Sequence, residues 1–236
     1  MSDHDPTYWN KLGALLRATI GERPVFVDAG ANRGDFTALL LQDFPAGTVH
    51  AVEPDPQLCA ALAERFSGNN VRIWGAALHE REGTIDLHVH ANPGTSSVLA
   101  RPADARRYFD SADRVVATLP VRAVTLDRLA EEAGIGHIDL LKMDTQGAEL
   151  SIIRGARRLL QAAAIDVIYT EFFLVPHYEG AALLHELWAP LAAHGYVMYD
   201  LFKGPYGRNG QLRFGDAIFV GPKVRERCLD AFPDEA

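Results

Sequence analysis

The sequence predicts an α/β fold: a mostly parallel seven-stranded sheet with helices on both faces and an antiparallel hairpin at one edge. Short apolar runs alternate with segments of helical periodicity, and this alternation is typical of a parallel sheet that is covered on both faces. The last two expected strands, at 196–201 and 216–220, have no helix between them, so they predict the antiparallel hairpin. Acidic residues follow several strands, at the edge where such sheets bind ligands.

Apolar residues at helical spacing predict a first helix at 7–20, ahead of the first strand. Strands are expected where short apolar or alternating runs end at turn residues, at 25–28, 48–52, 71–78, 84–90, 138–143, 166–170, 196–201 and 216–220. Further helices are expected where the helical spacing recurs, at 35–44, 56–66, 103–112, 124–133, 148–163 and 181–194. The rest of the segment 91–120 is expected to be irregular.

These elements predict a single domain over residues 1–236, because no repeat, low-complexity run or linker interrupts them. Residues 1–22 are expected to form an N-terminal helical extension, and residues 84–120 an inserted hairpin and loop region. The turn residues agree with this division. Pro54 stops the second strand, and Gly195 suits the left-handed position that follows a helix.

Composition excludes several classes of function. The 236 residues are 48% hydrophobic and 23% charged, which is ordinary for a globular chain. Acidic residues outnumber basic ones by 31 to 23 and no stripe of Lys and Arg is present, so we expect no nucleic-acid partner. No apolar run reaches membrane-spanning length, no leader opens the chain, and Cys59 and Cys228 lie far apart. We therefore expect no membrane partner and a cytoplasmic location.

The segment VDAGANRG at 27–34 is the most informative in the chain. An apolar strand ends there in Asp28, and Gly30 and Gly34 allow backbone angles that let a ligand approach the main chain. A dinucleotide site would carry G-x-G-x-x-G, whereas this turn reads G-x-N-x-G with Asn32 in the middle. The mismatch points away from NAD and towards S-adenosyl-L-methionine, whose ammonium group needs an anion nearby.

Glu53 strengthens this interpretation. It closes the second strand and lies 25 residues after Asp28, near the offset at which nucleotide-binding βαβ units place an acid for the ribose hydroxyls. Taken alone, Glu53 could simply cap a surface turn, but its spacing from the glycine turn favours ribose binding. Asp144 and Glu171 also end expected strands at this edge. Four carboxylates on one rim predict a ligand site rather than packing.

The chain resembles the FkbM-type S-adenosylmethionine-dependent methyltransferases in five segments between residues 25 and 175. These are VDAGANRG at 27–34, VEP at 52–54, GTSSV at 94–98, VTLDRL at 124–129 and IDLLKMDTQGAELSIIRGA at 138–156. The resemblance implies a Rossmann-like methyltransferase fold and methyl transfer, usually to a hydroxyl of a sugar or secondary metabolite. The chain departs from the family pattern at His79-Glu80, and its C-terminal third, where acceptor specificity would be expected, shows no match.

Nine residues at this edge of the sheet are expected to bind the cofactor: Asp28, Gly30, Asn32, Gly34, Glu53, Ala77, Leu78, Ser96 and Asp144. The glycine turn would shape the methionine end, where Asp28 orients the amino group. Ala77 and Leu78 would flank the adenine. Ser96 belongs to a polar loop whose hydroxyls could reach the methionine carboxylate, although the same loop could be an ordinary solvated turn.

The acceptor side needs a group that takes a proton, because an alcohol is a poor nucleophile until it loses one. Asp144 is the first choice, and the other catalytic candidates are Glu149, Glu171 and His177. Glu149 could instead only stabilise the start of a helix, and His177 could be a solvated loop residue. Asp144, Glu149 and Glu171 could together ligate Mg²⁺, but this is not favoured and no metal site is predicted.

The sequence therefore predicts an S-adenosyl-L-methionine-dependent O-methyltransferase with a small-molecule or glycan hydroxyl as its acceptor. Three alternatives are left open: an N-methyltransferase on a small molecule, an NAD-linked oxidoreductase and a non-catalytic nucleotide-binding module. The missing third glycine disfavours the oxidoreductase. The identity of the acceptor, the need for a metal and the oligomeric state are not predicted.

Overall fold

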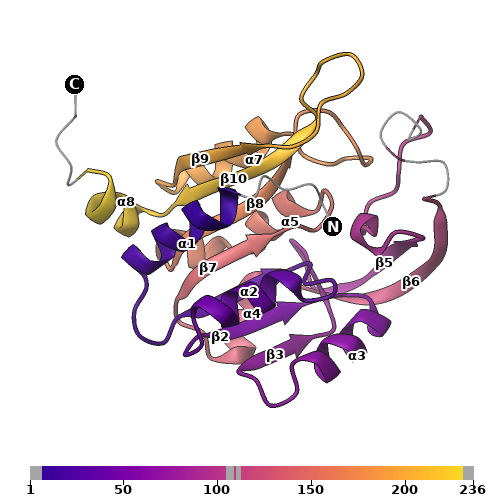
Figure 1. The fold of residues 1–236 in the computed structure, drawn as a ribbon. Coiled ribbons are helices and arrows are strands. Elements are labelled where there is room, and N and C mark those ends of the chain that lie inside the picture. The colour runs from indigo at the N-terminus through magenta and orange to yellow at the C-terminus, as the bar shows by residue number, and fades with distance from the viewer. Residues whose placement is uncertain (1–6, 105–108, 110–112, 231–236) are drawn as a thin grey trace.

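The computed structural model describes residues 7–104, 109 and 113–230 and has the predicted α/β architecture (Figure 1). Seven strands form the main sheet, in the order β3-β2-β1-β7-β8-β10-β9. The first five of these run parallel, and β10 lies antiparallel between β8 and β9. The strands are β1 (Val25–Ala29), β2 (Thr48–Val52), β3 (Val71–Trp74), β7 (Ile138–Met143), β8 (Ile165–Phe173), β9 (Val197–Lys203) and β10 (Phe214–Val220). The parallel sheet with an antiparallel edge hairpin is thus confirmed.

Helices cover both faces of the main sheet, as the alternation of strands and helices predicts (Figure 1). One face carries α1 (Thr7–Thr19), α2 (Asp35–Asp43) and α8 (Pro222–Cys228), which share an apolar cluster with the sheet. The other face carries α4 (Leu126–Ala133), α5 (Glu149–Arg154), α6 (Arg157–Gln161) and α7 (Leu184–Ala193). α3 (Pro56–Arg65) follows β2 and packs through Leu62 on Ala51.

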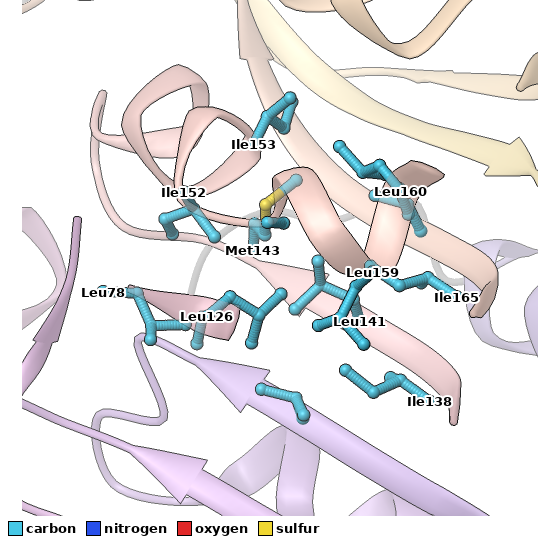
Figure 2. Packing of buried hydrophobic residues seen from close by; sticks show 14 of the residues in the cluster. Leu78, Leu126, Ile138, Leu141, Met143, Ile152, Ile153, Leu159, Leu160 and Ile165 are labelled. Carbon is cyan, nitrogen blue, oxygen red and sulfur yellow. The ribbon is translucent and has the colours of Figure 1, made fainter. Parts of the chain in front are cut away.

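Figure 2 shows the cluster between the sheet and the second group of helices. Leu141 and Met143 of β7 lie among side chains from α4, α5 and α6, including Leu126, Ile152 and Leu159. Each of these aliphatic side chains contributes about 1.5–3 kcal/mol when it is fully buried. This packing holds the carboxyl end of β7 beside that of β1 and so positions the residues that follow both strands.

A second, three-stranded sheet lies beside the main one and contains β4 (Ala77–Leu78), β6 (Val115–Val124) and β5 (Gly83–His90), in that order. β5 was predicted, but β6 corrects the expectation of irregular structure at 91–120. Pro120 hides the strand in the sequence, because proline cannot donate to a sheet. It is tolerated here since β4 pairs only with Ala123 and Val124, which leaves Pro120 with β5 as its neighbour. The predicted helix at 103–112 lies largely outside the described residues.

The expected strand 71–78 is two strands, β3 and β4, which belong to different sheets. The expected helix 148–163 is likewise divided into α5 and α6, because the backbone at Gly155 approaches another segment closely. A Cβ there would lie 2.4 Å from the carbonyl oxygen of His79. The η1 turn (Pro93–Thr95) falls in the polar loop after β5.

β8 also extends beyond its expected end. It reaches Phe173, because every residue from Ile165 to Phe173 is buried and those from Val167 onwards pair with β10. Glu171 therefore lies inside a strand, and Asp28 lies one position before the end of β1. The new positions of Glu171 and Asp28 have the same cause. A polar residue stays in a strand when the residues before and after it pair with neighbouring strands.

Candidate active site

A cavity of about 1060 Å³ lies at the carboxyl ends of the parallel strands. Its walls come from the turns after β1 and β2, from β4, from the loop after β5, and from β7, β8 and β10. The predicted site residues that line it are Gly30, Asn32, Glu53, Ala77, Leu78, Ser96, Asp144, Glu171 and His177. Asp28, Gly34 and Glu149 do not line it. The topology therefore brings most of the predicted residues to one place.

The glycine turn after β1 is tightly fitted to its neighbours. Gly30 has φ +72°, and a Cβ at this position would lie 2.0 Å from the carbonyl oxygen of Asp144. Its backbone N–H donates to the carbonyl of Val52 at 3.0 Å. Gly34 precedes α2 with φ +82°, and a Cβ there would lie 2.5 Å from the ring of Phe66. Gly30 thus serves the cavity wall, whereas Gly34 serves the packing of α2 against α3.

Asp28 is fully buried behind the cavity, and its side chain forms an ion pair with Lys142. The Lys142 ammonium lies 2.9 Å from the Asp28 carboxylate and donates to the carbonyl of Gly30 at 2.8 Å. Thr37 donates a further hydrogen bond to Asp28 at 2.7 Å. Burial alone would lower the pKa of Lys142, but the ion pair with Asp28 and the charges of Asp144 and Glu53 together outweigh it and hold that pKa above its ordinary value. Asp28 does not line the cavity, whereas Lys142 beside it does, and that Asp28 orients the ligand's amino group stays a prediction.

Glu53 presents its carboxylate to the cavity in a fixed orientation. Oε2 accepts from the backbone N–H of Asn32 at 2.8 Å, and Oε1 accepts from that of Asp55 at 2.9 Å. Burial raises the pKa of Glu53 to about 7, against the opposing effect of these two bonds. A carboxylate oxygen has more than one lone pair, so each Glu53 oxygen can accept a second hydrogen bond from a ligand. Two adjacent hydroxyl groups match this arrangement.

Gln146, which the sequence interpretation did not single out, connects three of the elements around the cavity. Its Nε2 donates to Asp144 and to Glu171, both at 2.9 Å, and its Oε1 accepts from the Tyr178 hydroxyl at 2.8 Å. Its φ of +58° lies in the left-handed region, which is unusual for a residue other than glycine. Such strain persists where surrounding contacts impose it, often at functional sites. The matched segment at 138–156 gave a signal for this turn but not for this residue.

Glu149 does not face the cavity. Its Oε1 accepts from the backbone N–H and the hydroxyl of Thr145, at 2.8 and 2.9 Å, and so closes the turn that leads into α5. Burial raises the pKa of Glu149 to about 7. The catalytic prediction for Glu149 is corrected, because its carboxylate is used within the loop that carries Gln146.

His177 lines the cavity but is enclosed by aromatic rings. It lies 4.9 Å from the ring centre of Phe173 and 5.5 Å from that of Phe214, and its Nδ1 is 3.0 Å from the carbonyl of Val175. Burial lowers the pKa of His177 to about 4. The imidazole is therefore neutral at neutral pH and is a weak base, so the geometry favours a carboxylate for proton removal.

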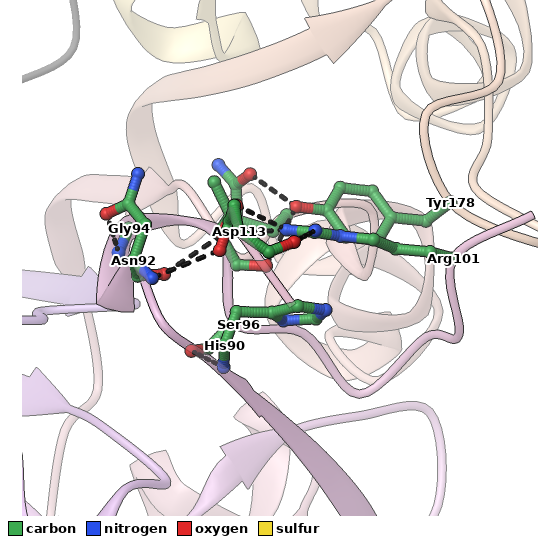
Figure 3. A network of polar contacts seen from close by, with 9 residues as sticks. His90, Asn92, Gly94, Ser96, Arg101, Asp113 and Tyr178 are labelled. Carbon is green, nitrogen blue, oxygen red and sulfur yellow. Dashed lines mark hydrogen bonds and ion pairs between the residues drawn. The ribbon is translucent and has the colours of Figure 1, made fainter. Parts of the chain in front are cut away.

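A polar network holds the loop after β5 over the cavity (Figure 3). Arg101 pairs with Asp113 at 2.7 Å and donates to the Thr95 hydroxyl at 2.8 Å. The Tyr178 hydroxyl is 3.0 Å from the carbonyl of Thr95, which links this network to Gln146. Ser96 accepts from the backbone N–H of His90 at 3.1 Å and lines the cavity. These contacts thus hold the loop in place as one wall of the cavity.

A group of side chains with the spacing of metal ligands lies outside the cavity. Within the described part of the chain, one group of three His, Asp or Glu side chains has its ligand atoms within 4.8 Å of one another: His137, Asp139 and Asp166. It lies at the amino ends of β7 and β8, away from the cavity. Among the same described residues, no helix is long and apolar enough to cross a membrane.

The fold and the cavity are those of a methyltransferase domain. The model of the methyltransferase FkbM domain matches residues 28–198, and the chain therefore belongs to the FkbM methyltransferase family. The domain of METTL16 that carries the same fold has a TM-score of 0.50 with 12% identity, covering 90% of this chain and 66% of that one.

Three curated relatives carry names that describe an activity. The 2-O-methyltransferase NoeI of Sinorhizobium fredii is 31% identical over 164 residues, which cover 66% of each chain. The 31-O-demethyl-FK506 methyltransferase FkbM of Streptomyces tacrolimicus is 28% identical over 206 residues, covering 78% of this chain and 77% of that one. The methyltransferase sdnD of Sordaria araneosa is 29% identical, and the match spans 62% of its length.

Proposed function

We propose that this chain transfers a methyl group from S-adenosyl-L-methionine to a hydroxyl group of a small molecule or glycan. Family membership supports methyl transfer, and the names of NoeI and FkbM describe transfer to oxygen. The observation that carries the proposal is the Glu53 carboxylate, held by two backbone N–H groups beside the Gly30 turn. A ribose diol is the ligand group that this arrangement fits.

The residues around the cavity fit the rest of the cofactor. Asn32 and the Gly30 turn would border its methionine part. Ala77 and Leu78 are buried, apolar and adjacent to the cavity, so they would flank the adenine. When bound, the cofactor supplies a methyl group activated by a sulfonium sulfur, which is the difficult part of the chemistry.

The chain's own residues would orient the acceptor and take its proton. Burial raises the pKa of Glu171 well above its ordinary value, and the neighbouring carboxylates, Asp144 first, raise it further. A carboxylate with a raised pKa is a stronger base. Gln146 holds the Asp144 and Glu171 carboxylates through one amide group, so both would face the acceptor hydroxyl in a fixed arrangement. Orientation of this kind lowers a barrier by several kcal/mol.

Calorimetric titration with S-adenosyl-L-methionine and S-adenosyl-L-homocysteine, with NAD as a control, tests the cofactor. We expect both adenosyl compounds to bind and NAD not to bind. Glu53→Gln should weaken binding about tenfold to a hundredfold, because each hydrogen bond to a charged group contributes about 1.5–3 kcal/mol. Glu64→Gln is the matched control, since Glu64 is exposed on α3 and does not line the cavity.

The acceptor is then sought among hydroxylated and amine-bearing compounds, with and without Mg²⁺. Transfer to a hydroxyl is expected, and transfer only to amines would favour the N-methyltransferase instead. If the unsubstituted protein binds the cofactor but transfers no methyl group to any acceptor, the result would favour the non-catalytic binding module. Binding of NAD in place of the adenosyl compounds would return the oxidoreductase to first place.

A further inference from the structure

Glu171 of β8 and Asp216 of β10 are directly opposite each other in the antiparallel ladder of those strands. Side chains in this relationship leave the same face of the sheet, with Cβ atoms about 4.5–5.5 Å apart. Both residues line the cavity and are buried, with 7% and 6% of their surfaces exposed. Two carboxyl groups therefore lie on the same wall of the cavity, where the acceptor would bind.

The surroundings of this carboxyl pair contain further acidic groups and tyrosines. The titratable groups that interact with it come from several elements. They are Asp144 and Glu149, which follow β7, Tyr169 of β8, Tyr8 of α1, and Tyr178 of the loop after β8. Lys142 lines the same cavity, but its ammonium is bound to Asp28 and to the carbonyl of Gly30. Gln146 donates one hydrogen bond to Glu171. Burial raises the pKa of Glu171 well above its ordinary value, and the carboxyl groups around it, Asp144 first and Asp216 among them, raise it further.

Two buried carboxylates that are neighbours on one face of a sheet repel each other, and such pairs can hold one proton between them. We propose that Glu171 and Asp216 share one proton in the ligand-free protein, and that Glu171 releases it when a cationic ligand enters the cavity and then serves as the base for the acceptor hydroxyl. This inference rests on the proposed function, in which the bound cofactor carries a sulfonium charge. Asp216 is the residue of the pair that the sequence did not indicate.

The transfer step balances with this assignment. The acceptor O–H bond breaks and its proton goes to the ionised Glu171, while an oxygen electron pair forms the bond to the methyl carbon. The bond from that carbon to sulfur breaks, and its electron pair stays on sulfur, which becomes an uncharged thioether. The cationic charge has then gone, so the negative charge of Asp216 keeps the proton on Glu171. The pair is then singly protonated, as in the ligand-free protein, and it stays so when the products leave.

The number of protons released on ligand binding tests this inference without any acceptor. Calorimetry near pH 7, in two buffers of different ionisation enthalpy, gives that number for S-adenosyl-L-methionine and for S-adenosyl-L-homocysteine. The two compounds share their ribose and amino-acid groups, so proton exchange at Glu53 cancels in the difference. We expect S-adenosyl-L-methionine to release up to about one proton more. Glu171→Gln and Asp216→Asn should each reduce the difference towards zero.

Asp139→Asn is the matched control, because Asp139 is also a buried strand carboxyl whose pKa burial raises, but it does not line the cavity. This variant should keep the difference. Equal proton release by the two compounds in the unsubstituted protein, or a difference that persists in Glu171→Gln, would overturn the inference.

Infrared titration of the ligand-free protein separates this inference from the proposed function. Besides Glu53 and Glu149, whose pKa values burial raises to about 7, one further carboxyl group should lose its proton around or above neutral pH in the unsubstituted protein, and this additional signal should be absent in Glu171→Gln. In Asp216→Asn it should shift to lower pH, because the neighbouring negative charge is gone. An unchanged titration in Asp216→Asn would overturn the shared proton even if the cofactor binds, and the expected shift would support it even if the cofactor does not.

Discussion

Two pairs of buried residues occupy equivalent positions on neighbouring strands at the carboxyl edge of the sheet. Asp28 of β1 is opposite Lys142 of β7, and Glu171 of β8 is opposite Asp216 of β10. The first pair joins opposite charges at 2.9 Å, and further hydrogen bonds satisfy both partners. The second pair joins two carboxyl groups that face the cavity.

The two pairs differ in their roles: the first supports the fold, and the second can take part in the chemistry. Lys142 ties β1, β7 and the Gly30 turn together, and removal of either charge would leave the other uncompensated in a region of low dielectric constant. In the second pair, by contrast, the like charges are relieved by a proton. A proton can move when a ligand changes the local charge, whereas a satisfied ion pair has no such freedom. The first pair therefore suits a scaffold, and the second suits an acid or base group.

The largest expected effect is on the rate of methyl transfer. Glu171→Gln keeps the shape of the side chain but removes its ability to take a proton, so the rate should fall about 10²- to 10⁴-fold. The free energy of unfolding should change by less than about 1 kcal/mol, because no buried charge loses its partner. Initial rates with an acceptor from the screen and urea unfolding check both statements. Full activity in this variant would exclude Glu171 as the base.

Lys142→Met should show the opposite behaviour and lower the free energy of unfolding by about 3–5 kcal/mol, because Asp28 is left buried without its partner. Urea unfolding measures this loss. The double variant Asp28→Asn, Lys142→Met should recover the larger part of it, since neither charge is then present. If Lys142→Met costs no more stability than Glu171→Gln, the contrast between the two pairs is wrong.

The pH dependence of binding isolates the cofactor half of the cavity. Because burial raises the pKa of Glu53 to about 7, part of this carboxyl is protonated at lower pH and accepts hydrogen bonds less well. The affinity for S-adenosyl-L-homocysteine should therefore rise between about pH 6 and pH 8, by at most about tenfold per pH unit. Calorimetric titration with this uncharged thioether avoids a sulfonium effect on the Glu171–Asp216 pair. In Glu53→Gln the rise should be absent, and a rise that persists would assign it to another group.

The smallest expected effect concerns the hydrogen bonds that hold Gln146. Tyr178→Phe removes the hydroxyl near Gln146 and Thr95 and should cost about 0.5–1.5 kcal/mol of stability. Tyr196→Phe is a matched control, because the buried Tyr196 hydroxyl donates to the carbonyl of Ile165 away from the cavity. Both variants should lose similar stability in urea, but only Tyr178→Phe should change the pH profile of methyl transfer. Identical profiles would reduce Tyr178 to a packing role.

Local sequence patterns predicted much of the fold. The alternation of strands and helices and the final hairpin were visible because each strand and helix has its own apolar spacing. Errors arose where a distant segment decided the outcome. Pro120 lies within β6 because β4 is too short to reach it, and the helix expected at 148–163 breaks where Gly155 meets the backbone of His79.

The same division applies to the candidate site. Gly30, Asn32 and Glu53 could be recognised in the sequence, because a turn after a strand and a carboxylate at a set spacing are local signals. The partners of Asp28 and Glu171 could not. Lys142 lies 114 residues after Asp28 and Asp216 lies 45 after Glu171, and strand order and register bring each pair together. By itself, the sequence determined most of the strands and helices and indicated that Gly30, Asn32 and Glu53 lie at the same edge of the sheet. Only the tertiary structure decided which buried charges are paired and which share a wall of the cavity, because register depends on packing across the whole sheet.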